Sequence, residues 1–534
     1  MPAADVLTVP SRVITSGSRP GSRPHGSDAT GPRRGVRTVP SSGAPAPVAR
    51  PTGVLMAHDE VRRSTGGALT SGLKSRQITM ISIGGVIGAG LFVGSSAAIA
   101  EAGPAVLVSF VLAAALVVLV MKMLGEMAVA NPDTGSFSSY ADRALGRWAG
   151  FSIGWLYWWF YVLVVPIEAI VAGEIIGSAL PVPAWGPAFA VIVLLAGSNL
   201  MAVRNYGEFE YWFALLKVVA IVGFLVLGVL AIFGLLPGSG TSGVSHLWAE
   251  GGFLPNGGIS ILAGLLTAMF AFQGSEIVTI AAAESEAPKR NIRKAISAVV
   301  WRLALFYIGS VFVVVALVPW NAPDLVAHGS YQAALERMNV PGAAVVMDVV
   351  VLTAVCSCLN SAIYTASRMV FSLAKRGDAP RLLGTTGGNG TPRAAVLAST
   401  VIGAVAVVLN YVVPEFFGYL LASSGAIALI MYLVIASTQL ATRRAVRARG
   451  AESALESPMW AFPHLTVVTI VSITGILLTM AILPGHRLEL WLSLSLAAVL
   501  VVVGVVLQRR DGRAVSEPGR PLQVRSGDER TNTP

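Results

Sequence analysis

The chain has 534 residues, of which 54% are hydrophobic and only 12% are charged. Soluble domains carry about 25% charged residues, so this composition excludes an ordinary soluble protein and indicates an integral membrane protein. The formal net charge of +10 would suit a nucleic-acid-binding protein, but the placement of the basic residues argues against that class.

The first 72 residues differ from the rest of the chain. They are rich in Ser, Gly, Pro and Arg, contain no apolar run long enough to cross a membrane and do not resemble a signal peptide. We predict a disordered cytoplasmic N-terminal tail over residues 1–72, with Met56 as an alternative to Met1 as the start. A second cytoplasmic tail is expected over residues 511–534.

Apolar stretches of roughly 20 residues are long enough to cross a bilayer as helices. The sequence contains twelve such stretches, and we predict spanning helices at about 77–100, 104–130, 149–178, 184–201, 211–234, 259–282, 297–319, 341–372, 395–413, 417–440, 463–483 and 488–508.

Lys and Arg residues are distributed unevenly among the loops between these spans. The loops after odd-numbered spans contain only Arg337 and Arg487, whereas basic clusters at 289–294, 375–393 and 443–449 follow even-numbered spans. Because basic loops stay on the cytoplasmic side, both termini are predicted to be cytoplasmic. The basic excess therefore indicates topology and not nucleic-acid binding.

The first span is rich in glycine, although each glycine costs a helix about 1 kcal/mol relative to alanine. Its glycines are Gly84, Gly85, Gly88, Gly90 and Gly94. One explanation is close helix packing through the two G-x-x-x-G spacings. The other is an interrupted helix whose free backbone groups bind a ligand. The sixth span favours the second, because the polar sequence QGSE at 273–276 interrupts it about halfway along.

Ionisable residues at membrane depth are rare and are functional candidates by default. Lys217 lies six residues into the span predicted at 211–234, from which its ammonium could also extend to the cytoplasmic surface. Glu276 could orient the interrupted helix, contact a ligand or carry a proton, and Glu126 could pair with a basic residue or gate an exit. Glu168 receives no role. Four residues nearer to helix ends are expected either to extend to the membrane surface or to fix the topology: Lys122, Arg302, Arg368 and Asp348.

The sequence contains no pattern that predicts an enzyme. It has no P-loop, no H-E-x-x-H motif and no clustered His and Cys residues with metal-ligand spacing. Cys356 and Cys358 would point roughly 200° apart on a helix, so we expect them to be unpaired small core residues. We therefore expect no catalytic residue, no metal ion and no cofactor.

Several motifs together resemble a known family. The chain is similar to the amino-acid permeases of the APC superfamily in IGGVIGAGLFVGS of the first span, LGEM at Leu124–Met127, GSFSSYA at Gly135–Ala141 and NSAIYTASRM at Asn360–Met369. Within that superfamily it most resembles the bacterial GABA permeases in GSEIVTIAAAES at Gly274–Ser285, VVALVPWN at Val314–Asn321, SCLNSAIYTASRM at Ser357–Met369 and SSGAIAL at Ser423–Leu429. The resemblance is strong over about 72–445, weak over the last two spans and absent from the N-terminal tail.

The resemblance implies an all-α membrane protein with the LeuT-like fold. Residues 73–445 would form a ten-helix core of two inverted five-helix halves, and residues 446–510 would add two helices. Helices 1 and 6 of such proteins are broken. By similarity, the N–H groups of Gly88, Ala89 and Gly90 would receive the substrate carboxylate.

The resemblance also assigns the substrate ammonium and the coupling proton. Carbonyls near Val86 and Ile87, with those of Phe270, Ala271 and Gln273, would hold the ammonium group. Phe270 would gate the site, although it could equally be a core or lipid-facing aromatic residue. Lys217 matches a helix-5 lysine that takes the place of a bound ion in proton-coupled relatives.

These features predict a plasma-membrane transporter that imports GABA or a related ω-amino acid together with a proton. Its partners would be the amino acid, the proton and the lipid bilayer, without nucleic acid, and a monomer would be functional. Three alternatives stay open: a permease of the same fold for another α-amino acid, an exchanger, and a receptor or nutrient sensor built on the transporter fold. Competition against labelled GABA would identify a permease for another amino acid. Dependence of uptake on internal substrate would identify an exchanger, and binding without accumulation would identify a receptor or sensor.

Overall fold

The computed structural model describes residues 73–510 except for 85, 93, 202, 414–423 and 425. All named secondary-structure elements in this part of the chain are helical. Leu73 and Ser285 form an isolated bridge. The tails predicted at 1–72 and 511–534 lie outside the described residues.

The first half of the described chain contains long helices with short interruptions. Its helices are α2 (Ser75–Gly84), α3 (Ala89–Phe92), α4 (Gly94–Ala102), the 3-10 turn η1 (Gly103–Ala105), α5 (Val106–Ala130), α6 (Ser136–Leu145), α7 (Arg147–Ala179), α8 (Trp185–Leu200), α9 (Val203–Ile232) and α10 (His246–Ala249).

The second half is also helical throughout its named elements. These are α11 (Ser260–Ala271), α12 (Ile277–Ala283), α13 (Pro288–Arg302), the π-helical turn η2 (Leu303–Ile308), α14 (Gly309–Leu317), α15 (Pro323–Ala327), α16 (Ser330–Arg337), α17 (Ala343–Arg376), η3 (Arg381–Gly384), α18 (Arg393–Val412), α20 (Ile427–Ala448), η4 (Glu452–Ala454), α21 (His464–Ile482), η5 (Pro484–His486) and α22 (Arg487–Arg510).

Eight helical stretches of the described chain are long and apolar enough to cross a membrane, compared with the twelve spans predicted. They are Gly90–Ala130, Arg147–Ala179, Val203–Ile232, Pro288–Leu317, Ala343–Arg376, Arg393–Val412, His464–Ile482 and Arg487–Arg510. Two of the other predicted spans are interrupted and one is short, while the span predicted at 417–440 lies partly outside the described residues. The span predicted at 184–201 is the 16-residue helix α8, and α20 ends in a basic segment.

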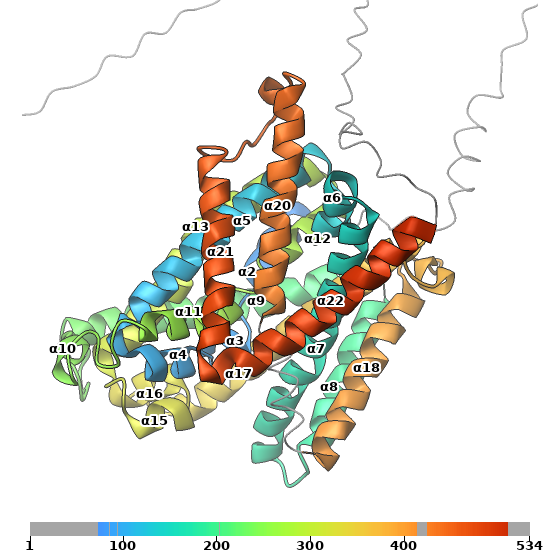
Figure 1. The fold of residues 1–534 in the computed structure, drawn as a ribbon. Coiled ribbons are helices and arrows are strands. Elements are labelled where there is room, and N and C mark those ends of the chain that lie inside the picture. The colour runs from blue at the N-terminus through green and yellow to red at the C-terminus, as the bar shows by residue number, and fades with distance from the viewer. Residues whose placement is uncertain are drawn as a thin grey trace, which may run out of the picture. The chain divides into compact units, whose positions relative to one another are not determined.

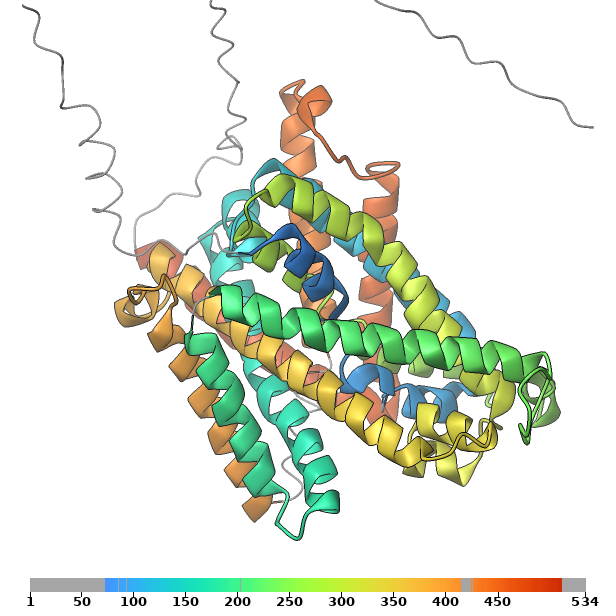
Figure 2. The same cartoon turned by 180° about the vertical axis from the view of Figure 1, so that it is seen from behind.

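The helices α7 and α17 pack along each other in the core of the described region. α8 and α18 form a pair that also packs against α7 and α17, and α22 crosses α7 (Figure 1). Figure 2 shows α9 and α17 running side by side, with α2 next to α9. Long apolar helices with one buried stripe associate in this way because small and apolar side chains interlock.

Both glycine-rich and polar segments interrupt helices at the predicted places. α2 ends at Gly84 and α3 begins at Ala89, while α11 ends at Ala271 and α12 begins at Ile277. Gly274 has φ +97°, a left-handed conformation that glycine adopts without a Cβ penalty. The close-packing explanation is not supported at Gly94, because a Cβ built there would meet no atom within 4 Å.

Candidate functional site

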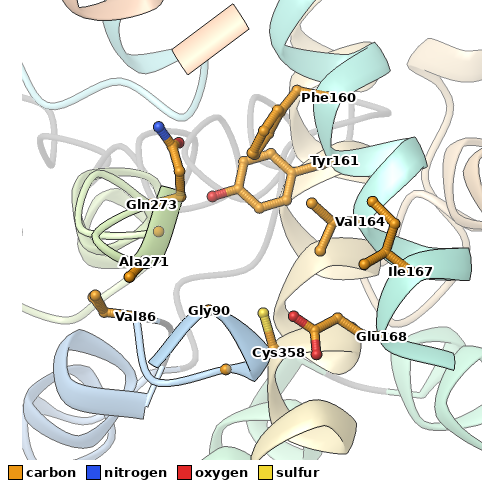
Figure 3. Close-up of a pocket in the computed structure, with 12 residues that line it drawn as sticks. Val86, Gly90, Phe160, Tyr161, Val164, Ile167, Glu168, Ala271, Gln273 and Cys358 are labelled. Atoms are coloured by element: carbon orange, nitrogen blue, oxygen red, sulfur yellow. The ribbon is translucent and has the colours of Figure 1, made fainter. Parts of the chain in front are cut away.

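A cavity lies between the two helix interruptions and helix α7 (Figure 3). Its empty volume, with the space open to solvent included, is about 430 Å³. It is lined by Val86, Gly88, Gly90, Phe160, Tyr161, Val164, Ile167, Glu168, Ala271, Gln273, Gly274 and Cys358. Of the predicted substrate-binding residues, the cavity brings together Val86, Gly88, Gly90, Ala271 and Gln273. Interrupted helices expose backbone polar groups only where protein or a polar cavity surrounds them, and this placement meets that condition.

The carbonyl groups at the first interruption already accept hydrogen bonds. Tyr307, on the π-helical turn η2, donates its hydroxyl to the Val86 carbonyl at 2.7 Å. Lys217 donates from Nζ to the Ile87 carbonyl at 2.9 Å. A carbonyl oxygen has two lone pairs, so each can accept a further donor. These are the carbonyls predicted to meet the substrate ammonium.

Gly88 occupies a tight contact between α7 and α17. A Cβ at this position would lie 3.0 Å from Cys358 Sγ and 3.0 Å from Glu168 Oε1. A larger residue at this position would therefore require both neighbours to shift. The Ala89 and Phe270 side chains, the second predicted as a gate, lie outside the described part of the structure.

Gln273 presents an unsatisfied amide in the lining of the cavity. Both its Nε2 and Oε1 atoms are buried, and neither has a hydrogen-bond partner among the described residues. An unpaired buried amide is costly, so a polar ligand group would be stabilised there. The sequence-based prediction concerned only the backbone carbonyl of Gln273. The side-chain amide is a second polar group of the same residue at the cavity.

Glu276 lies behind the cavity lining. Its Oε1 accepts hydrogen bonds from Tyr161 at 2.9 Å and from Tyr157 at 3.2 Å, both on α7. Tyr161 itself lines the cavity (Figure 3), so Glu276 is connected to the cavity through this hydroxyl. This geometry ties the start of α12 to α7.

Lys217 is fully buried near the middle of α9 and does not reach the membrane surface. The suggestion that its ammonium extends to the cytoplasmic surface is therefore wrong, because α9 begins at Val203 and not at 211. Its Nζ donates to Ser357 Oγ at 2.8 Å as well as to the Ile87 carbonyl. Lys217 thus connects α9 to α17 and to the first interruption.

Several residues of the site were not predicted from the sequence. Glu210 is fully buried and accepts a hydrogen bond from Ser357 Oγ at 2.5 Å. Its spacing of seven residues from Lys217, which places both on one helix face, was the available signal. Cys358 was predicted to be a core residue but lines the cavity beside Glu168 (Figure 3). Phe160, Tyr161, Val164 and Ile167 are apolar or aromatic helix residues without any distinguishing pattern.

Glu126 connects the core to the C-terminal helices. Its carboxylate contacts Arg443 Nη1 at 2.7 Å, Gln439 Nε2 at 3.0 Å and the Met459 backbone N–H at 2.5 Å. It lies outside the cavity lining.

Arg368 and Arg302 were expected to extend to the membrane surface or to fix the topology, and the first of these two roles is wrong because both side chains are buried. Arg368 is 1% exposed and forms an ion pair with Glu284 at 3.1 Å. Arg302 is 7% exposed and donates to the carbonyls of Ala298 and Ala295 on its own helix. Buried guanidinium groups are found where acceptors surround them, and a linear sequence does not show those acceptors.

Comparison with known proteins agrees with this architecture. The family model described as amino acid permease matches residues 77–518, which includes the C-terminal helices where the sequence resemblance was weak. The chain is 56% identical over 449 residues to a probable GABA permease of Pseudomonas aeruginosa, covering 84% of this chain and 94% of the relative. It is 54% identical over 444 residues to the gamma-aminobutyric acid permease of Escherichia coli K12, covering 83% and 95%.

Two further relatives are less similar, and the name of the second gives another class of substrate. The chain is 48% identical over 440 residues to a gamma-aminobutyric acid permease of Bacillus subtilis, covering 82% of this chain and 93% of the relative. It is 41% identical over 456 residues to the aromatic amino acid transport protein AroP of Corynebacterium glutamicum, covering 84% and 98%. With a family match over most of its length and a site between interrupted membrane helices, the chain belongs to the amino acid permease family and is a membrane transporter, not an enzyme.

Proposed function

We propose that this transporter imports GABA or a related ω-amino acid across the plasma membrane by proton symport, with alternating access. The observation that carries the proposal is the similarity to three GABA permeases over at least 93% of each relative's length. The cavity supports it, because backbone groups at two helix interruptions can meet both ends of a zwitterion without a formal countercharge.

The proposed architecture is a LeuT-like arrangement of twelve spanning helices. The two interruptions would fall in the first and sixth helices of two inverted halves over 73–445, and α21 and α22 would be the two additional helices over 446–510. Eight apolar stretches and the two interruptions support this assignment. Both termini would be cytoplasmic, and one copy of the chain would suffice for transport.

In the proposed complex, the N–H groups of Gly88, Ala89 and Gly90 receive the substrate carboxylate. The Val86 and Ile87 carbonyls, with the 270–273 segment, receive the ammonium. GABA separates its charges by three methylenes, so its ammonium must meet acceptors farther from the carboxylate than an α-amino acid requires. The Gln273 amide and the Tyr161 hydroxyl backed by Glu276 are polar groups on that side of the cavity.

Lys217 is the proposed proton-coupling group. Its ammonium donates a hydrogen bond to the Ile87 carbonyl at the interruption. A change in its protonation state would therefore change the strength of a hydrogen bond at the proposed substrate site.

The test is uptake of labelled GABA into proteoliposomes with an imposed pH gradient, alkaline inside. We expect accumulation that a protonophore abolishes, and a loss of at least tenfold in Lys217→Ala. Lys289→Ala, which changes an exposed lysine paired with Glu456, is the matched control and should accumulate as the unchanged protein does.

Two other results would change the assignment. Stronger competition by aromatic or other α-amino acids than by ω-amino acids would overturn the substrate, as the similarity to AroP would then suggest. Uptake that requires internal amino acid and ignores the pH gradient would identify an exchanger.

A further inference from the structure

One buried hydroxyl connects Lys217 to a second ionisable residue on the same helix. Lys217 Nζ donates to Ser357 Oγ at 2.8 Å, and Ser357 Oγ donates to Glu210 Oε1 at 2.5 Å. Lys217 and Glu210 lie on α9, and Ser357 lies on α17, which runs beside it (Figure 2). All three residues are 0% exposed.

Burying two ionisable side chains costs free energy unless each side chain has a partner of opposite charge or a hydrogen-bonding group. An isolated buried charge costs several kcal/mol, whereas an ion pair joined by a hydroxyl satisfies both ends. The other ionisable groups that act on Lys217 are Glu168 and Cys358 beside the cavity. Asn360, Ser361 and Tyr206 lie around Glu210. Glu210 is thus the buried carboxylate joined to Lys217 through a single hydroxyl.

We propose that Lys217, Ser357 and Glu210 form a proton relay that carries the coupling proton from the substrate site toward the cytoplasm. The inference rests on the proposed proton symport and extends it to the route of proton release. An N–H bond of the Lys217 ammonium breaks as Ser357 Oγ accepts its proton. Ser357 gives its own hydroxyl proton to Glu210 Oε1. The products are a neutral amine and a neutral carboxylic acid, so charge and protons balance.

The direction of the relay follows from the orientation of its hydrogen bonds. Lys217 donates, Ser357 accepts and donates, and Glu210 accepts, so every bond points from the interruption toward the start of α9. Glu210 is seven residues nearer to that start, about 10 Å along the helix axis. The distribution of basic loops predicts that this end of α9 faces the cytoplasm.

A layer of aromatic and charged side chains lies beyond Glu210. The Tyr206 hydroxyl bonds Ser361 at 3.1 Å, and the Tyr206 and Tyr364 rings stack with centroids 4.1 Å apart. Arg368 lies 4.0 Å from the Tyr364 ring centroid and pairs with Glu284. Glu284 precedes Ser285, which forms an isolated bridge with Leu73, two residues before α2 begins. Opening this layer would expose Glu210 and release its proton with the substrate.

The relay also explains how the proton and the substrate are coupled. Lys217 bonds the Ile87 carbonyl as well as Ser357. When its proton passes to Glu210, the bond to Ile87 loses its charge assistance. The substrate site and the proton route therefore share one side chain, and release of one weakens the binding of the other.

The relay is tested by comparing two assays in proteoliposomes with Ser357→Ala, Ser357→Thr and Glu210→Gln. Net uptake of labelled GABA down a pH gradient requires proton release. Counterflow exchange at equal pH allows the loaded protein to return with its proton. We expect Ser357→Ala and Glu210→Gln to lose net uptake at least tenfold while counterflow stays within about threefold. Ser357→Thr keeps the hydroxyl and should restore net uptake.

Glu208→Gln is the matched control, because Glu208 lies on the same helix but is partly exposed and pairs with Arg76. It should change neither assay. Failure of the unchanged protein to accumulate GABA with a pH gradient would overturn proton symport, and the relay with it. Normal accumulation by the unchanged protein together with full net uptake by Ser357→Ala would overturn the relay alone. If Glu210→Gln loses both net uptake and counterflow, the two Ser357 variants provide the test. Equal net uptake by Ser357→Ala and Ser357→Thr contradicts the relay. Net uptake restored in Ser357→Thr but not in Ser357→Ala supports it.

Discussion

At the scale of single residues, Gly88 shows why the first span tolerates poor helix formers. A Cβ built there would lie in tight contact with a thiol on α17 and a carboxylate on α7. A side chain would require both neighbours to shift. The glycine is needed for this close approach, and the weaker helix propensity is accepted where the helix is interrupted anyway.

Replacing Gly88 with leucine should abolish substrate binding while the protein still inserts into the membrane. Overpacking at a tight contact costs about 1–3 kcal/mol and displaces the lining, so we expect at least a tenfold loss of GABA binding. Binding by purified protein and the amount of membrane-inserted protein are the two measurements.

Gly94→Ala is the control for this change, since a Cβ at Gly94 meets no atom within 4 Å. It should bind GABA within about twofold of the unchanged protein. Gly90→Leu should behave as Gly88→Leu does, because Gly90 also lines the cavity. Normal uptake by both leucine variants would refute the interrupted-helix account of the site.

At the scale of elements, Glu126 fastens α5 to α20 and to the segment that precedes α21. Glu126 is 4% exposed and its oxygens meet a guanidinium, an amide and a backbone N–H group. Arg443 also contacts Glu452 at 3.2 Å, so the cluster joins the core to the C-terminal helices. The contacts favour a structural role for Glu126 over a direct role in the cavity.

Glu126→Ala should therefore lower the stability of the protein more than it lowers the transport rate of the folded protein. Removing one partner of a buried ion pair costs about 3–5 kcal/mol, and we expect the lower end because Glu452 still contacts Arg443. The thermal unfolding midpoint in detergent measures the effect. Glu208→Ala breaks an exposed pair worth about 0–1 kcal/mol and is the control. Equal midpoints for the two variants would contradict this role.

At the scale of the whole molecule, the distribution of basic residues predicts the orientation. It places the 238–243 loop outside the cell and the 385–391 loop in the cytoplasm. Ser242 and Gly388 are exposed positions in these two loops. Because positive loops resist translocation, the two should be reached from opposite sides of the membrane.

Cysteine substitution tests the orientation in intact cells. Ser242→Cys should react with a membrane-impermeant maleimide, and Gly388→Cys should react only after the membrane is permeabilised. The protein with its native Cys356 and Cys358 gives the background labelling. Labelling of Gly388→Cys in intact cells would reverse the proposed topology.

The sequence allowed the interruptions and part of the site to be predicted. Glycine and QGSE stand where apolar helix formers are expected, and such local contradictions mark functional positions. Val86, Gly88, Gly90, Ala271 and Gln273 were assigned by the resemblance to the permeases, and they line one cavity. The α7 wall of the cavity was missed, because an aromatic or aliphatic residue on a buried helix looks the same whether it meets a ligand or a neighbouring helix.

The sequence by itself determined the membrane class, the family and the places where helices are interrupted. Hydropathy, glycine content and local motifs are properties of neighbouring residues, and each acts without reference to the rest of the chain. Only the tertiary structure decided which ionisable residues meet. Lys217 and Glu210 are joined by Ser357, 140 residues away from Lys217, and Arg368 pairs with Glu284. These partners depend on which helix faces pack together, and a local sequence pattern does not determine packing between distant segments.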